Sequence, residues 1–272
     1  MPHVLTPRVL RITALGCAAV LAASAADNQL TAQEKSAGWR LMFDGKTYAG
    51  WEDPTKKMPP GTGFTIEDGC LKSLPHPSIE EDLFTKALYR DFEMEFDWKI
   101  SPGGNSGVKY RIQERVMLAD AVPGQKFEDR ANASMKNRRK DRPAKGQEYV
   151  IGFEYQVLDN EKNPDARRGT NHQAGALYDM LSPLKDATKP VGEFNHSRLV
   201  VKGDAVEHWL NGVKVVDGSL NDPAVAKGTG ARWGTDSPVY ELLVKHPKKD
   251  CQISLQNHSS DAWFKNLKIR KL

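Results

Sequence analysis

The chain has 272 residues, of which 39% are hydrophobic and 27% are charged, and its formal net charge is +4. Removal of the leader described below takes away two arginines and no acidic residue, which lowers the charge to about +2. This balance gives no reason to expect a nucleic acid or an anionic membrane as partner, and the substrate need not be charged.

The first 25 residues are typical of a secretory signal peptide. Arg8 and Arg11 precede an apolar run from 12 to 23, and residues 23 to 25 (ASA) form a small-x-small cleavage site. The run is shorter than the about 20 apolar residues of a membrane span. Lipoprotein anchoring at Cys17 is a weaker alternative, because the apolar run continues past that cysteine. The sequence therefore predicts export, either to the periplasm or out of the cell.

The remaining chain of about 247 residues suits a single large domain, since it shows no internal repeat and no second-domain pattern. Residues 26 to 37 are polar and predict a flexible lead-in. Two cysteines remain, Cys70 and Cys251, and an oxidising compartment would allow them to be bridged. Two separate buried thiols are the alternative. The spacing of a zinc site is absent.

The first expected elements are short. Residues 38 to 51 contain an apolar run that a turn signature, residues 44 to 46 (DGK), interrupts, and Trp51 closes the segment. This tryptophan would either pack in the core or line a groove. Residues 64 to 73 alternate on both sides of Asp68-Gly69, which predicts a β-hairpin.

The clearest strand pattern lies at residues 91 to 100, where apolar and charged side chains alternate. A loop of turn formers, residues 101 to 107, leads to a second alternating run at 108 to 113. We expect these two strands to be neighbours, with the acidic face of the first beside the basic face of the second.

Residues 114 to 147 interrupt the strand pattern. The segment is polar, basic near its end and too long for an ordinary hairpin connection. Loops of this kind are usually lids over a site or mobile excursions. Because the central strand follows at once, we expect this loop to stand near it.

That central strand is predicted at residues 148 to 158, where apolar side chains at every second position from 149 to 157 share one face. The opposite face carries Glu154 and Gln156 in the middle of the strand. A carboxylate and an amide at this place indicate the face on which chemistry occurs.

The rest of the chain adds a polar loop at 161 to 180, strands at 193 to 202 and 205 to 216 with a hairpin turn at Asn211-Gly212, and two short alternating runs. Helical patterns are nearly absent. Roughly a dozen short strands separated by turns predict an all-β sandwich of the jelly-roll type.

Seven segments resemble, in this order, the 3-keto-disaccharide hydrolase domain of secreted bacterial proteins: GWRLMFDGKTYAGW, WKISPGGNSGVKYR, EYQVLDN, GALYDM, KPVGEFNHSRLVVKG, VEHWLNGVKV and SLQNHSSDAWFKNLKIRKL. The resemblance covers about residues 38 to 272. It implies a concanavalin/laminarinase-like jelly roll, in agreement with the strand pattern. Two departures are the segment from 115 to 146, which has no counterpart in the family core, and QNHSS, where a QDHG-like sequence is commoner.

The resemblance also implies cleavage of glycosides whose sugar has been oxidised to a ketone at carbon 3. This ketone acidifies the proton on carbon 2, so a base can remove it, the substituent on carbon 1 leaves by elimination, and water adds afterwards. Such a site needs a base, an acid for the departing oxygen, and donors or a cation facing the enolate oxygen.

Glu154 is the first candidate base, because a carboxylate centred on a middle strand of a jelly roll would face the concave groove. An exposed or ion-paired glutamate is the alternative. The other candidate catalytic residues are His208, His258, His172, which could also be a metal ligand, and Lys109. The candidates for substrate binding are Arg111, Gln156, Asn105, Arg198, Asn195, Trp51 and Trp209.

Salt bridges and core packing are the structural alternatives for these side chains. No cofactor is expected. Calcium is conceivable because many loops carry oxygen ligands, but no EF-hand spacing is present.

Two other functions remain open. One is a non-catalytic carbohydrate-binding module, and the other is a conventional two-carboxylate glycoside hydrolase. A retaining laminarinase-type strand would carry a second carboxylate on the face of Glu154, whereas Leu158 shares that face and Asp159 points away from it. We expect the site on one concave sheet built from strands 91 to 100, 108 to 113, 148 to 158 and 193 to 210.

Overall fold

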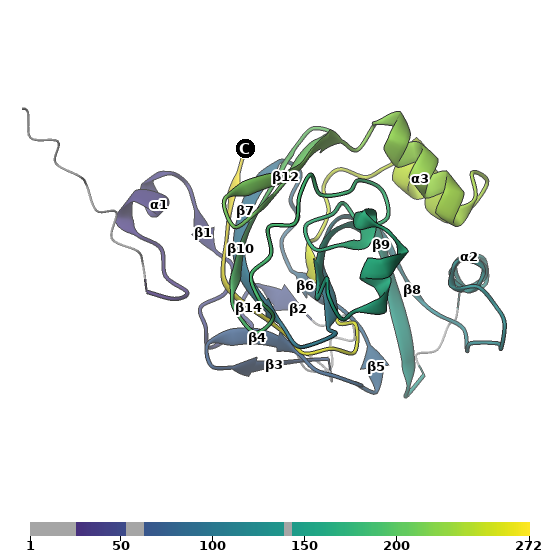
Figure 1. Ribbon diagram of the computed structural model, residues 1–272, viewed down its shortest axis with the longest axis horizontal. Helices are drawn as coiled ribbons and strands as arrows, with labels where there is room; N and C mark the ends of the chain where they lie inside the picture. Colours follow the sequence, from purple (N-terminus) through teal and green to yellow (C-terminus); the bar gives the residue numbers. More distant parts are fainter. Residues whose placement is uncertain (1–25, 53–62, 139–142) are drawn as a thin grey trace, which may run out of the picture.

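Two β-sheets, one of eight strands and one of six, carry the fold (Figure 1). The computed structural model describes residues 26–52, 63–138 and 143–272, so the predicted signal peptide lies outside the described residues. The larger sheet consists of β1 (Arg40–Leu41), β3 (Phe64–Glu67), β4 (Cys70–Ser73), β7 (Phe92–Ile100), β10 (Asn195–Lys202), β11 (Ala205–Leu210), β12 (Val213–Ser219) and β14 (Ala262–Lys271).

The smaller sheet consists of β2 (Trp51–Glu52), β5 (Ile79–Glu80), β6 (Leu83–Thr85), β8 (Asn105–Met117), β9 (Gly146–Leu158) and β13 (Ser254–Leu255), in the spatial order β2-β6-β13-β8-β9-β5. The helical elements are α1 (Ala32–Ser36), α2 (Phe127–Lys136), η1 (Pro164–Arg168), η2 (Thr170–His172), α3 (Pro223–Trp233), α4 (Pro238–Tyr240) and η3 (Glu241–Lys245).

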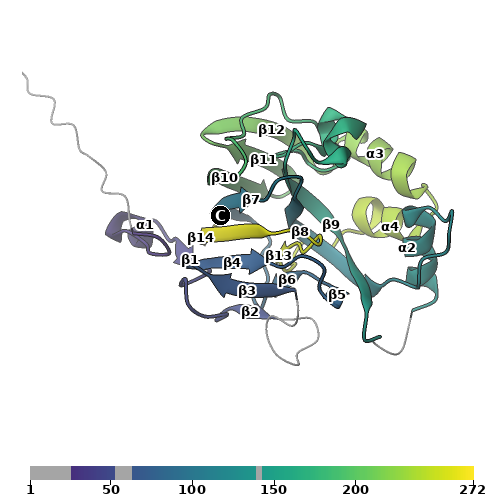
Figure 2. The same ribbon diagram turned by 60° about the horizontal axis from the view of Figure 1, so that its bottom comes forward.

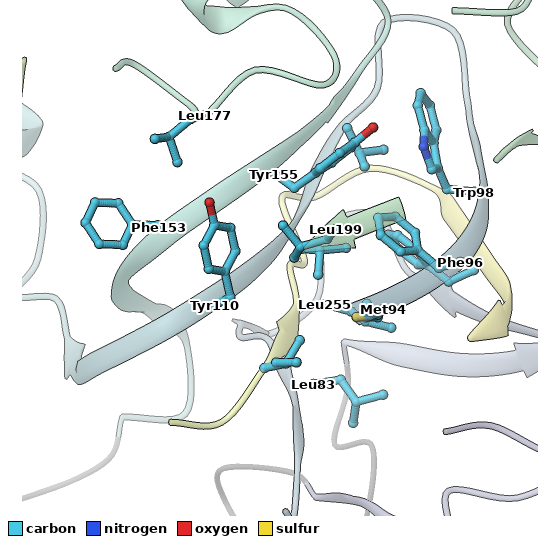
Figure 3. Close-up of a cluster of buried hydrophobic side chains, with 14 of the residues drawn as sticks. Leu83, Met94, Phe96, Trp98, Tyr110, Phe153, Tyr155, Leu177, Leu199 and Leu255 are labelled. Carbon is cyan, nitrogen blue, oxygen red and sulfur yellow. The ribbon is translucent and has the colours of Figure 1, made fainter. Parts of the chain in front are cut away.

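The core lies between the two sheets, where the apolar faces of their strands meet. Figure 3 shows Met94, Phe96 and Trp98 of β7 in the same cluster as Phe153 and Tyr155 of β9, and each of these side chains is at most 2% exposed. Burial of each large apolar side chain contributes about 1.5–3 kcal/mol. The predicted all-β jelly-roll sandwich is therefore confirmed.

The expected neighbourhood of the strands at 91 to 100 and 108 to 113 is wrong. β7 pairs with β10 and β14 in the larger sheet, whereas β8 pairs with β9 and β13 in the smaller one. The acidic face of β7 is paired with cations of its own sheet, among them Arg198 and Lys268. The four strands expected to share one sheet are thus divided between two: β7 and the strands of residues 193 to 210 lie in the larger sheet, and β8 and β9 lie in the smaller one.

The segment ahead of Gly38 is anchored to the sandwich and does not form a loose lead-in. Thr31 and Glu34 form a capping box at the start of α1, and Glu34 also pairs with Lys268 of β14. The backbone N–H of Asn28 donates to Asn266 Oδ1 at 2.6 Å, and the N–H of Asn266 donates to Asn28 Oδ1 at 2.9 Å.

Both remaining cysteines are free and buried. Cys70 lies in β4 of the larger sheet, while Cys251 bridges to Tyr89 beside the smaller sheet. The two cysteines do not form a disulfide bond, so the predicted bridge between them is wrong and they are two separate buried thiols. Burial raises the pKa of both thiols.

The long segment between β8 and β9 contains α2, and its Asn132 donates to the carbonyl oxygen of Trp233 at the end of α3 at 3.1 Å. Figures 1 and 2 both show α2 and α3 on the side of the molecule away from α1. No helix in the described ranges is long and apolar enough to cross a membrane.

Candidate functional site

A cavity of about 710 Å³ lies over the smaller sheet, on the face of β8 and β9 that points away from the core. Residues 163 to 178, α2, the end of α3 and residues 256 to 260 form its walls. The lining side chains that can ionise or form hydrogen bonds include Asp82, Asn105, Lys109, Tyr149, Glu154, Gln156, Asp165, Arg168, Tyr178, Arg232, Gln256 and His258.

Lys109 and Glu154 form the centre of this cavity. They are direct cross-strand partners on β8 and β9, and Lys109 Nζ lies 4.0 Å from Glu154 Oε2. Asp82, which precedes β6, brings a second carboxylate to within 3.8 Å of the same Nζ. Ser254 donates to Asp82 Oδ2 at 2.8 Å. One ammonium group is therefore flanked by two carboxylates.

Burial strongly affects the pKa values of Glu154, Asp82 and Lys109. It raises the pKa of Glu154 to about 7, although the charge of Lys109 opposes the rise. It raises the pKa of Asp82 as well, again against Lys109. Burial alone would lower the pKa of Lys109, but the two carboxylates outweigh it and raise that pKa. Near neutral pH the site holds a charged ammonium beside a carboxyl group that can readily take up or release a proton.

Amide groups surround the three charged side chains. Gln156, with its amide nitrogen turned toward acceptors, donates to Glu154 Oε1 at 3.0 Å. Asn105 Oδ1 and Gln256 Oε1 are buried without a hydrogen-bond partner among the described residues. Both residues line the cavity, so hydroxyl groups of a bound sugar can donate to these acceptors.

Gly107 of β8 leaves the space that the Glu154 side chain occupies. A Cβ atom at Gly107 would lie 2.8 Å from Glu154 Cγ and 2.9 Å from Cδ, closer than such atoms approach. The absence of a side chain at this position therefore allows Glu154 to stand beside Lys109.

Gly107→Ala should move the Glu154 carboxyl group and, on the prediction that Glu154 is the catalytic base, lower kcat by about 10- to 100-fold, because a small misplacement of a catalytic group has this effect. Gly152→Ala is the matched control, since a Cβ there would press on backbone, 3.0 Å from the Tyr110 carbonyl oxygen. We expect it to lower stability more than Gly107→Ala does. Steady-state kinetics and thermal melting measure the two effects, and full activity of Gly107→Ala would contradict this role.

The loop after β9 holds further groups against the cavity. Asp165 accepts hydrogen bonds from Tyr178 Oη at 2.8 Å and from Arg168 at 2.9 Å. His172 lies behind them, with Nδ1 3.2 Å from Asp165 and Nε2 3.1 Å from Asp179. His172 thus supports the wall of the cavity and does not line it.

Arg232 connects the helices to this loop. Its Nε lies 3.3 Å from Glu128 of α2 and 3.4 Å from Asp179, and its guanidinium stands 5.3 Å from the centre of the Tyr178 ring. The helix that carries Arg232 was not expected from the sequence.

Five of the twelve predicted site residues line the cavity, namely Glu154, Lys109, His258, Gln156 and Asn105. His172 supports it, and the structure places the other six elsewhere.

Two of these six are core residues. His208 is fully buried, donates from Nδ1 to the carbonyl oxygen of Gly175 at 2.9 Å and accepts from Tyr110 at 3.0 Å. Burial lowers the pKa of His208 to about 4, so the ring is neutral and holds the Gly175 loop to the core. Trp51 is also fully buried and donates to the carbonyl oxygen of Met42 at 2.7 Å.

Arg198 and Trp209 lie on the outer face of the larger sheet. Arg198 pairs with Glu93 and stands 4.9 Å from the centre of the Trp209 ring. Both side chains therefore form a salt bridge and a stacking contact on the outer face of the sheet, which is the structural alternative to substrate binding.

Arg111 and Asn195 bind backbone groups. Arg111 donates to the carbonyl oxygen of Gly203 at 2.6 Å and to that of Lys249. Asn195 Oδ1 accepts from the N–H of Lys189 at 2.8 Å. Neither residue lines the cavity.

Several residues that line the cavity were not predicted from the sequence. Tyr149 was assigned to the core by its alternation, but it is half-buried, and its ring centre lies 5.0 Å from Lys109 Nζ. Tyr178 and Gln256 stand inside the recognised segments GALYDM and SLQNHSS, so those segments carried a signal. No pattern in the sequence indicated Asp82 or Arg232, because neither lies in a predicted strand.

Within the described ranges no group of three or more His, Cys, Asp or Glu side chains is arranged to hold a metal ion.

Comparison with known proteins agrees with the recognised segments. The model of the 3-keto-alpha-glucoside-1,2-lyase-like domain matches residues 38–270. A 3-keto-disaccharide hydrolase from Bacteroides thetaiotaomicron is 32% identical over 251 residues, which cover 86% of this chain and 79% of that protein.

Solved structures of two glycosyl hydrolase candidates from Parabacteroides distasonis are also similar. One has a TM-score of 0.68 at 28% identity and covers 91% of this chain and 100% of its own. The other has a TM-score of 0.55 at 25% identity and covers 86% and 99%, respectively. The chain belongs to the 3-keto-alpha-glucoside-1,2-lyase-like domain family.

Proposed function

We propose that this protein cleaves the glycosidic bond of 3-keto-glycosides, 3-keto-disaccharides among them, by base-promoted elimination followed by addition of water. Family membership and the 32% identical hydrolase support the coarser statement, a carbohydrate-active enzyme that cleaves glycosidic bonds. The contact of Lys109 with Glu154, inside a cavity large enough for a sugar, supports the more specific proposal of base-promoted elimination on a 3-keto-glycoside.

The reaction requires a base and a cation that are neighbours, because the acidic proton and the ketone oxygen belong to adjacent carbons of the sugar. The Glu154 carboxylate takes the proton from carbon 2, and the electron pair moves onto the oxygen of carbon 3. The Lys109 ammonium, 4.0 Å from Glu154, stabilises the enolate that forms.

The enolate then returns to the ketone as the bond between carbon 1 and its oxygen breaks. The departing oxygen takes up a proton and leaves as an alcohol, and His258 at the rim of the cavity is the candidate donor. Water adds its oxygen to carbon 1 of the unsaturated sugar and gives one proton to His258, while Glu154 returns its proton to carbon 2. The balance is one glycoside and one water converted into a 3-keto sugar and an alcohol.

One observation favours a second candidate, the conventional glycoside hydrolase. Asp82 supplies the second carboxylate that the central strand lacks. However, the Asp82 side chain is 4% exposed and is held by Lys109 and Ser254, which suits a group that positions the ammonium. We therefore rank elimination first.

The test compares a native disaccharide with the same disaccharide oxidised at carbon 3. We expect cleavage of the oxidised sugar alone, measured by the appearance of both products in chromatography. Cleavage of the native sugar at a similar rate would support the two-carboxylate hydrolase. Binding of either sugar without cleavage would support the carbohydrate-binding module.

A further inference from the structure

A second cavity, of about 1000 Å³, lies between α2, α3 and the loop that carries η1 and η2. It shares three lining residues with the reactive cavity, Glu128, Arg168 and Arg232. The two cavities therefore meet, and these three side chains form the boundary between them.

We propose that this second cavity is a subsite for the leaving group of the substrate and that it takes neutral sugar units. The inference rests on the proposed function, because only that function defines a leaving group. In a 3-keto-glycoside the leaving group is attached to carbon 1, so it is the part of the substrate that extends beyond the reactive sugar.

The charges of the second cavity favour a neutral ligand. Its four cations, Lys126, Lys136, Arg168 and Arg232, are matched by four carboxylates, Glu128, Asp129, Asp179 and Asp236. A phosphorylated or carboxylated leaving group would meet as many repelling charges as attracting ones. Paired charges and amides supply the donors and acceptors that hydroxyl groups use.

An unfilled acceptor adds to this argument. Asn132 of α2 donates from Nδ2 to the carbonyl oxygen of Trp233, but its buried Oδ1 has no partner among the described residues. Asn132, Asn137 and Asn171 all line the second cavity. A sugar hydroxyl would satisfy the Asn132 oxygen, whereas an apolar leaving group would leave it unpaired.

The segment between β8 and β9 contributes helix α2 to this subsite. α2 lies within residues 114 to 147, and its Glu128 pairs with Arg232 of α3 in the lining of the cavity. We infer that this segment gives the enzyme its preference among leaving groups, while the residues on β8 and β9 perform the reaction.

The test measures kcat/KM for three substrates with the same reactive sugar: a methyl 3-keto-glucoside, a 3-keto-disaccharide and a 3-keto-trisaccharide with two sugars on the leaving side. We expect kcat/KM to rise by about 10-fold or more from the methyl glycoside to the oligosaccharides, because remote binding energy stabilises the transition state.

Ala133→Phe and Ala231→Phe fill the second cavity from opposite helices. Both alanines are exposed and line this cavity but not the reactive one. Each variant should lose the preference for oligosaccharides and keep the wild-type rate on the methyl glycoside. Ala224→Phe, at an exposed position of α3 outside both cavities, adds the same bulk and should change neither rate.

The outcomes separate the two proposals. Equal kcat/KM for all three substrates, or an unchanged preference in both filled variants, would overturn the subsite and leave the proposed function standing. Failure of the wild type to cleave any of the three 3-keto substrates would overturn both.

Discussion

Replacing Glu154 with glutamine is expected to lower kcat for a 3-keto-glycoside by about 100-fold or more, the usual range for the loss of a general base. Glutamine keeps the size of the side chain and its hydrogen bonding but cannot take up the proton from carbon 2. Lys109 keeps Asp82 as a partner at 3.8 Å, so we expect the fold to persist. Steady-state kinetics on a 3-keto-disaccharide measure the loss.

The pH dependence supplies a second measurement on the same residue. Glu154 acts as a base only when ionised, and its pKa is raised to about 7, so kcat/KM of the wild type should fall about tenfold per pH unit below that value. This acidic limb should be absent from any residual activity of Glu154→Gln.

The stability of the wild type should also change with pH, in the direction expected of a carboxyl group whose pKa burial raises. A carboxyl group whose pKa is raised in the folded state makes folding less favourable as the pH rises from its unfolded value, 4.5, through about 7. Across this window the wild type should lose about 3 kcal/mol of unfolding free energy relative to Glu154→Gln, which does not titrate.

Glu95→Gln is the matched control, because Glu95 pairs with Lys268 at 2.8 Å on the other sheet, away from the cavity. It should leave kcat unchanged. If Glu154→Gln kept full activity and only melted at a lower temperature, Glu154 would be a structural partner of Lys109, and the assignment of the base would be wrong.

The sequence predicted the strands well because alternation reports directly which side of a strand is buried. Glu154 and Gln156 were found in this way, since they interrupt an apolar strand on its outer face. The same argument was available for His208, which shares its face with Val206 and Leu210, and it would have placed that histidine in the core.

Alternation does not report which strands pair. The loop at 101 to 107 has the composition of a hairpin turn, yet the chain crosses there from the larger sheet to the smaller one. The pairing depends on contacts between segments far apart in the chain, such as β7 with β14. For this reason Arg198 and Trp209 were expected in a site that forms on the other sheet.

The remaining cavity residues come from segments without a periodic pattern. Asp82 precedes a strand of three residues, and Arg232 stands on a helix whose sequence contains two glycines besides small residues. Packing against distant segments places both, so neither local propensity nor spacing could indicate them.

Replacing Lys109 with methionine is expected to lower kcat by about 100- to 1000-fold, the range observed when one group that stabilises an oxyanion is removed. Methionine has a similar length and no charge. Without the ammonium, the largest effect that opposes burial at Glu154 is lost, so the pKa of Glu154 should rise above about 7. The acidic limb of the residual activity should therefore move to higher pH.

A buried cation also stabilises its surroundings, and this role must be separated from catalysis. Loss of one member of a buried ion pair costs about 3–5 kcal/mol. Because Asp82 and Glu154 can take up protons, the unfolding free energy of Lys109→Met should be lowest relative to the wild type at pH 8 and should recover toward pH 5. Urea unfolding at the two pH values measures this recovery.

The double variant Lys109→Met with Asp82→Asn decides between the two roles. Asparagine has the shape of aspartate but no charge, so the variant no longer buries an unpaired carboxylate at Asp82 and should regain much of the stability. It still lacks the ammonium beside Glu154, so kcat should stay low. Recovery of both stability and kcat would show that Lys109 acts only through the integrity of the cavity, and enolate stabilisation would then have to come from another donor there, such as Gln156 or Tyr149.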